Sequence, residues 1–205
     1  AFTGGIGKEW GCYGTEYALT NEDAYPIKTY IDYGLHEMAT KEEQKTDPIT
    51  SFLEVLGYLK EGEQMWMQIF IRATKKEWEK EGKKLVEKLM KEKEAAKEET
   101  INVGALKLTP GEKTIIEAIE RDVSKLGFDV GIRQMYLAKN EKYNAVNVAS
   151  MIGAMKQYNA LNLNGFKPAR GTTINYFFKK TREAILKTKI LDFYRSRSYF
   201  YINYE

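Results

Sequence analysis

The fold is decided by the stretch Gln64-Met65-Trp66-Met67-Gln68-Ile69-Phe70-Ile71-Arg72. Successive side chains of a β-strand point to opposite faces of a sheet, and this stretch keeps that period of two throughout. One face is wholly apolar, with Met65, Met67, Ile69 and Ile71. The other face, from Trp66 to Phe70, is largely apolar as well. The pattern therefore predicts a strand inside a sheet.

A second strand is predicted over residues 128–137, directly after a helix. Thr109-Pro110-Gly111-Glu112 forms a capping box with proline at the first helical position, and Gly127 ends the helix. The residues from Phe128 to Leu137 then alternate again, with Phe128, Val130, Ile132, Gln134 and Tyr136 on one face. We expect the two strands to be neighbours in the sheet.

Three further helices are predicted around these strands. Asp47-Pro48 is typical of a helix start, and apolar residues follow at helical spacing until Gly62. Residues 75–99 contain nine Lys and eight Glu with a narrow apolar seam, which indicates an exposed helix stabilised by ion pairs. Residues 142–160 form another apolar-faced helix. Residues 99–108 are predicted to link the charged helix to the next one.

The two ends of the chain have weaker patterns. Residues 1–46 are predicted to be mostly irregular, with one or two short strands, of which Ile27–Ile31 has the strand-like pattern. Asn162–Pro168 is predicted to be a polar loop, followed by a basic helix and a short aromatic strand over Tyr199–Tyr204. The order of elements predicts one α+β domain over residues 1–205. Its antiparallel or mixed sheet is covered on one face by helices, as in a ferredoxin-like fold with a charged helical-hairpin insertion.

Several classes of site are disfavoured by the residues present. Gly7-Lys8 lacks the glycine five residues earlier and the following Ser or Thr that a phosphate loop needs, because Phe2 and Glu9 stand there. Cys12 is the only cysteine and His36 the only histidine, so a zinc site or a histidine-activated nucleophile is not expected. We predict no metal, no cofactor and no catalytic residues of the chain's own.

The most pronounced binding signal is the basic, aromatic segment 167–205, which has nine Lys and Arg against three Asp and Glu. Cations beside aromatic rings are what single-stranded nucleic-acid binders use, and acidic lipid headgroups attract the same charges. The alternative is that the rings belong to the core and the cations to the wet face. The candidate contacts for an anion or a nucleic acid are Lys179, Lys180, Arg182, Lys187, Lys189, Arg195 and Arg197.

A second candidate contact is formed by Arg72 and Arg133, which lie on the two strands predicted to be neighbours. Side by side and exposed, the two guanidinium groups would bind a carboxylate or phosphate of a partner. Structural salt bridges are an equal alternative for both.

Several phrases of the sequence together resemble one family. They are residues 23–30, the Asp47-Pro48 helix start, and residues 62–69, 108–113, 130–133 and 162–168. These phrases resemble the region N-terminal to the motor domain of conjugation-type, type IV secretion-like ATPases from candidate-phyla bacteria. The resemblance extends from about Trp10 to Tyr201 and contains no catalytic signature.

The resemblance implies a noncatalytic domain joined to a hexameric DNA-translocating or secretion ATPase at the cytoplasmic face of the membrane. We therefore expect an assembly or partner-binding domain. The alternative is single-stranded nucleic-acid binding, and a hydrolase that uses carboxylates is the least supported. Expected partners are the adjoining motor domain or further copies of the chain, with DNA and the membrane surface as further candidates. The absence of an initiator Met suggests a piece of a longer protein.

Overall fold

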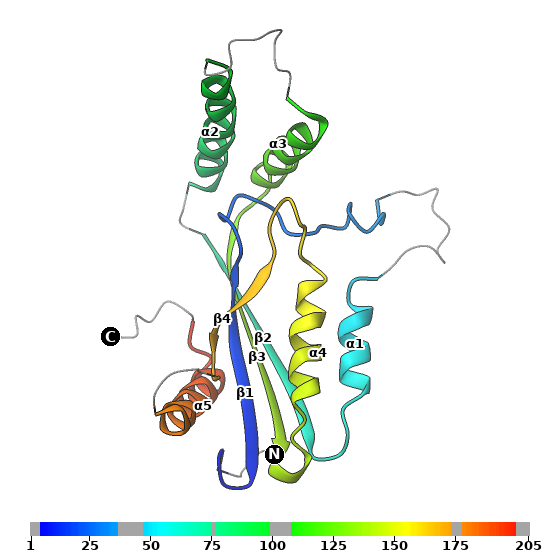
Figure 1. Ribbon diagram of the computed structural model, residues 1–205, viewed down its shortest axis with the longest axis vertical. Coiled ribbons are helices and arrows are strands. Elements are labelled where there is room, and N and C mark those ends of the chain that lie inside the picture. The colour runs from blue at the N-terminus through cyan, green and yellow to red at the C-terminus, as the bar shows by residue number, and fades with distance from the viewer. Residues whose placement is uncertain (1–4, 37–46, 75–76, 99–107, 174–177, 200–205) are drawn as a thin grey trace.

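A computed structural model describes residues 5–36, 47–74, 77–98, 108–173 and 178–199 (Figure 1). The strands are β1 (Trp10–Leu19), β2 (Glu63–Ala73), β3 (Phe128–Lys139) and β4 (Phe166–Gly171). The α-helices are α1 (Thr50–Gly57), α2 (Trp78–Glu98), α3 (Pro110–Val123), α4 (Ala145–Lys156) and α5 (Lys179–Ser196), and the short 3₁₀ helix η2 is Asn140–Lys142.

The four strands form one sheet in the order β2-β3-β1-β4, and every neighbouring pair is antiparallel. Helix α1 connects β1 to β2, and α4 connects β3 to β4. This is the strand order and connectivity of a ferredoxin-like sheet, with α2 and α3 inserted between β2 and β3. The predicted α+β class, the antiparallel sheet and the pairing of residues 64–72 with 128–137 are confirmed.

Helices cover both faces of the sheet, whereas one covered face was predicted. Met151 of α4 packs with Tyr13 and Tyr136 on one face, and Leu59, just after α1, packs against the same cluster. Ile190 of α5 packs with Cys12, Met135 and Leu137 on the opposite face. Figure 1 shows α1 and α4 side by side along the lower part of the sheet.

The prediction for residues 1–46 was wrong about the strand: the central strand β1 is Trp10–Leu19, and Ile27–Ile31 is not a strand, whereas residues 20–36 are irregular as predicted. Two glycines in β1 weaken its strand pattern in the sequence, because glycine is unfavourable in strands unless another element approaches closely. A Cβ atom on Gly14 would lie 2.8 Å from Ile190 Cδ1. On the other face, a Cβ atom on Gly11 would lie 2.6 Å from the ring of Tyr143. The glycines therefore allow α5 and the segment after β3 to contact β1 directly.

Two other predicted positions need correction. Strand β2 is an edge strand, because β1 pairs with β3 on the other side. The predicted loop 162–168 contains the start of β4, which pairs with β1 across a bulge between Glu16 and Tyr17. Pro168 is tolerated because β4 is the opposite edge of the sheet. Tyr199 is not in a strand, and the rest of the predicted strand 199–204 lies outside the described residues.

The helix boundaries follow local capping chemistry. Thr109 and Glu112 form the predicted capping box of α3. Asp47 accepts a hydrogen bond from the Ile49 N–H at 3.0 Å, but α1 begins at Thr50, later than predicted, and ends at Gly57, earlier than predicted. The apolar seam of α2 buries Leu85 and Val86 against α3, as expected for a charged insertion with one apolar seam. Among the helices of the described ranges, none is long and apolar enough to cross a bilayer.

The fully buried Asn164 fastens the loop after β1 to the loop before β4. Its side-chain oxygen accepts hydrogen bonds from the backbone N–H groups of Thr20 and Asn21, and its amide donates to the carbonyls of Glu22 and Tyr25. Buried polar groups are stable only when they are paired in this way. The contact fixes residues 20–26 beside the end of the sheet where β1 stops and β3 begins, which is its upper end in Figure 1.

Candidate partner-binding surfaces

The sheet forks at its upper end. Pairing between β1 and β3 stops at Glu16 and Arg133. Beyond this point β1 continues alongside β4 to Leu19, while β3 continues alongside β2 to Phe128. A cavity of about 600 Å³, called the fork cleft below, lies where the two pairs of strands separate.

The fork cleft has apolar walls and four acidic lining residues. Apolar and aromatic walls come from Tyr17, Tyr25, Trp78, Phe128 and Phe166, among others. The ionisable lining residues are Glu16, Asp23, Asp122, Asp129 and Arg170. Burial raises the pKa of the Asp122 carboxyl. Carboxylates beside aromatic rings suit a cationic or amphipathic group better than a phosphate.

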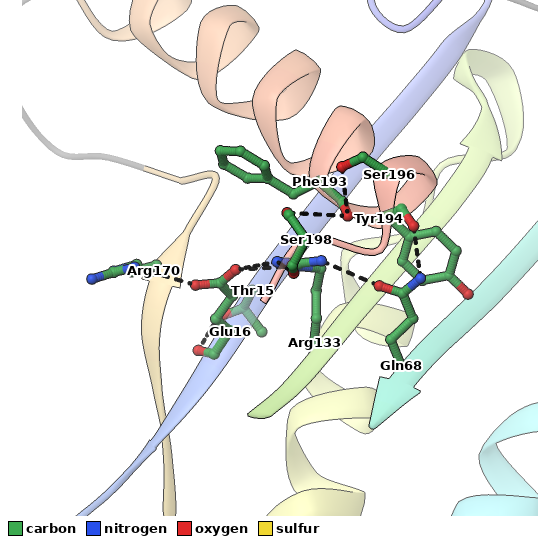
Figure 2. A network of polar contacts seen from close by, with 9 residues as sticks. All are labelled: Thr15, Glu16, Gln68, Arg133, Arg170, Phe193, Tyr194, Ser196 and Ser198. Carbon is green, nitrogen blue, oxygen red and sulfur yellow. Dashed lines mark hydrogen bonds and ion pairs between the residues drawn. The ribbon is translucent and has the colours of Figure 1, made fainter. Parts of the chain in front are cut away.

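A buried ion pair lies at the base of the fork (Figure 2). Arg133 donates from Nε and Nη2 to Glu16 Oε1 at 3.1 and 2.7 Å, and both side chains are almost fully buried. Arg133 Nη1 donates to Gln68 Oε1 at 3.2 Å. The exposed Arg170 approaches Glu16 Oε2 at 3.6 Å from β4. The network thus joins all four strands.

The same network holds the C-terminal end of α5 on the sheet. Gln68 Nε2 donates to the Tyr194 carbonyl at 2.7 Å, and Arg133 Nη2 donates to the Ser198 carbonyl at 3.4 Å (Figure 2). The carbonyls at a helix C-terminus lack partners within the helix and carry partial negative charge, so a cation there is favourable. The pair formed by Arg133 and Glu16 therefore positions α5 as well as the strands.

The structure does not bring Arg72 and Arg133 together. Arg133 lies opposite Gln68 in the sheet, whereas Arg72 lies opposite Asp129, four residues further along β2. Arg72 is 54% exposed in its side chain, donates to Asp129 Oδ2 at 3.0 Å and stacks 4.3 Å from the centre of the Tyr199 ring. Both guanidinium groups thus take part in structural salt bridges, and only Arg72 reaches the surface.

The basic residues predicted on the C-terminal segment lie on α5 and at its end. Six of them are exposed and Lys187 is half-buried; the exposed ones are Lys179, Lys180, Arg182, Lys189, Arg195 and Arg197. Lys179 and Lys180 occupy the first turn, where like charge from the helix dipole is unfavourable. Lys179 has a carboxylate neighbour in Glu183 at 3.9 Å, and the cations of this end lie next to the exposed Phe178.

The aromatic residues at the other end of α5 pack on the sheet. Tyr194 lies 5.0 Å from Trp66, measured between ring centres, and Tyr199 lies 6.1 Å from Phe70. Phe193 lies 5.8 Å from the Arg133 guanidinium. These rings pack against β2 and β3, as the structural alternative proposed for Tyr194, whereas Phe178 is exposed. Four further aromatic residues of segment 167–205 lie outside the described residues: Tyr176, Phe177, Phe200 and Tyr201.

An exposed apolar strip lies on the upper part of β2 and β3, and the sequence did not reveal it. Ile71 pairs with Val130 and Ala73 pairs with Phe128, so these side chains share the face that α1 and α4 cover lower down. The strip consists of Ile69, Ile71, Phe128 and Val130, which are 54%, 65%, 56% and 51% exposed. Alternation predicted which face these residues share, but not where the covering helices end.

Cys12 and His36 do not form a reactive pair in their observed environments. Cys12 is 1% exposed, and burial raises the pKa of its thiol to about 12 although Lys187 acts in the opposite direction. His36 is exposed and its ring lies 6.5 Å from that of Tyr30. In the described parts of the chain, no three His, Cys, Asp or Glu side chains are grouped closely enough to hold a metal ion.

A hydrogen-bonded cluster at the lower end of the sheet consists of Glu63, Tyr136 and Asn147. Tyr136 Oη donates to Glu63 Oε1 at 2.5 Å, Asn147 Nδ2 donates to the same oxygen at 2.7 Å, and the Lys60 N–H donates to Oε2 at 2.8 Å. Partial burial opposes ionisation, but these hydrogen bonds prevail and lower the pKa of Glu63. The carboxylate joins β2 and β3 to the start of α4.

Comparison with protein-family models, with curated proteins and with solved structures gave no match.

Proposed function

We propose that this chain is a noncatalytic assembly domain that binds a protein partner. The observation that carries the proposal is the apolar strip of Ile69, Ile71, Phe128 and Val130, in which each side chain is more than half exposed. Contiguous exposed apolar side chains on a soluble domain are typical of protein interfaces. The strip lies on paired strands, so its side chains are held in place before a partner arrives.

Three ionisable groups outside the apolar strip support a structural role for the parts of the domain in which they lie. Glu16 is engaged by Arg133, Glu63 by Tyr136 and Asn147, and Cys12 is buried with a raised pKa. A general base or nucleophile must reach a substrate in a suitable protonation state. These three groups instead stabilise the contacts between the sheet and its helices.

The resemblance to the region before the motor domain of conjugation-type ATPases suggests which partner the domain binds and where it works. On this proposal the partner is the ATPase motor of a conjugative-transfer or secretion machine, and the domain works at the cytoplasmic face of the membrane. The apolar strip would contact the motor together with the part of the fork cleft that Phe128 and Val130 line, while α5 remains accessible.

Binding of the purified chain to the purified motor domain of such an ATPase tests the proposal by biolayer interferometry. The wild-type chain should bind at micromolar concentration, and Ile71→Lys combined with Val130→Lys should abolish binding, because two charges would be buried in the interface. Val146→Lys is the control, since Val146 is 65% exposed but lies on α4. Equal binding by all three proteins, or none by the wild type, would contradict the proposal.

A second candidate function is the binding of single-stranded nucleic acid, favoured by the exposed Lys179, Lys180 and Arg182 beside the exposed Phe178. Phosphate contacts make affinity fall steeply with salt. Fluorescence anisotropy with an oligonucleotide should show this dependence and a loss of affinity when the three cations become alanine. Lys113→Ala on α3 is the control, and a null result at low salt would remove this candidate.

A further inference from the structure

The outer edge of β2 carries few of the features that normally keep a sheet edge from pairing. β2 is eleven residues long, and its run from Met65 to Ile71 contains no charged residue, glycine or proline. In the described part of the chain no strand pairs with this edge. Natural proteins usually protect a long apolar edge with charges, proline, bulges or a covering element, because its free N–H and C=O groups attract another strand.

We propose that the edge of β2 pairs antiparallel with β2 of a second copy of this chain, about a twofold axis at Gln68. This inference rests on the proposed assembly function and names one partner. The register places Met65 opposite Ile71 and Met67 opposite Ile69 on one face. On the other face it places Trp66 opposite Phe70, an aromatic pair of the kind that stabilises antiparallel strands.

The charges at the two ends of β2 select this register. A twofold axis at Met67 would place Glu63 opposite Ile71, and an axis at Ile69 would place Arg72 opposite Trp66 and Gln68 opposite Phe70. With the axis at Gln68, Arg72 faces the polar Gln64 and Glu63 faces the small Ala73. Apolar residues then face apolar residues along the whole uncharged run.

The edge of β2 is complementary to itself, which favours a second copy of the chain as its partner. In a twofold interface each surface patch must match itself, and the alternation of β2 does so in this register. The result is an eight-stranded sheet with four strands from each copy. The exposed Ile69 and Ile71 of each copy gain the partner's Met67 and Met65 as neighbours, which removes apolar surface from water.

Size-exclusion chromatography with light scattering tests the dimer on the whole chain. The wild type should have twice the monomer mass of 23.7 kDa at micromolar concentration. Ile69→Lys should weaken association by at least about tenfold, because a charge on an edge strand disfavours pairing. Val146→Lys, on α4, should leave the dimer unchanged. A monomer at all concentrations, or equal dissociation by both variants, would overturn the inference.

Disulfide formation tests the register. The double variant Met67→Cys, Ile69→Cys should form a covalent dimer on mild oxidation, because each new thiol would face its counterpart on the partner strand. Either single variant should cross-link poorly, since its thiol would face Ile69 or Met67 instead. Efficient linking by a single variant would show a different register and overturn the pairing proposed.

The outcomes separate this inference from the proposed function. A monomeric wild-type chain that binds the motor domain would refute pairing through β2 and leave the assembly function in place. A dimer with the predicted cross-links that does not bind the motor domain would support the pairing and contradict the assignment to the ATPase machine. Binding of an unrelated extended peptide to the β2 edge of a monomeric chain would also overturn the inference.

Discussion

At the scale of single residues, the buried Arg133 links three parts of the molecule. Its guanidinium joins Glu16 of β1, Gln68 of β2 and the chain after α5, and its side chain is 1% exposed. Burying an ion pair costs desolvation free energy, so the pair specifies the arrangement of the sheet more than it adds stability. Loss of one member leaves the other charged and buried.

We predict that Arg133→Met lowers the free energy of unfolding by about 3–5 kcal/mol, because Glu16 would remain buried without its closest partner. Arg72→Met, which removes an exposed pair on the neighbouring strand, should cost less than about 1 kcal/mol. Chemical denaturation followed by circular dichroism measures both. The double variant Glu16→Leu, Arg133→Met should be more stable than Arg133→Met alone, and similar losses for Arg72→Met and Arg133→Met would contradict this account.

The carboxylate of Glu63 gives the stability a defined pH dependence. The pKa of Glu63 is lower in the folded state than the value of about 4.3 in the unfolded chain. Its ionisation therefore stabilises the fold above pH about 4.3, and this stabilisation is lost as the pH falls through the folded pKa. Glu63→Gln should therefore be less stable than the wild type at neutral pH, and the difference should shrink in acid. Urea unfolding across this range measures it, with the exposed Glu61→Gln as control; a constant difference would contradict the assignment.

At the scale of elements, the position of α5 depends on a glycine in β1. Because a Cβ atom on Gly14 would lie 2.8 Å from Ile190, Gly14→Val should push α5 from the sheet and cost about 1–3 kcal/mol. Limited proteolysis should then cleave α5 faster. Gly153→Ala on α4, where a Cβ atom meets nothing within 4 Å, should instead stabilise the domain by about 0.5–1 kcal/mol. Unchanged cleavage of α5 in Gly14→Val would be inconsistent with this packing.

Some helices and strands are predictable from local sequence signals and others are not. β2, β3 and the capped helix α3 were predictable because their periodicity and capping residues are local signals. β1 was not, since Gly11 and Gly14 suit a strand only when Tyr143 and Ile190, distant in sequence, pack over them. For the same reason no sequence pattern revealed the apolar strip: exposure of Ile71 depends on where α1 and α4 end.

At the scale of the whole molecule, the domain has two covered regions and one open one. α1 and α4 cover the lower part of one face, and α5 covers the other face through the network of Arg133 and Gln68. The upper part of β2 and β3 keeps its apolar strip exposed beside the fork cleft. An assembly domain needs such a surface on a rigid base.

Amide hydrogen exchange of the whole chain, alone and with saturating ATPase motor domain, tests the assembly function most directly. The account predicts that the motor slows exchange in residues 69–73 and 128–131 and leaves the middle of α4 unchanged. Those backbone groups adjoin the apolar strip, whereas α4 is remote from it. Unchanged exchange around the strip, or slower exchange confined to α5, would contradict the claim that this surface binds the partner.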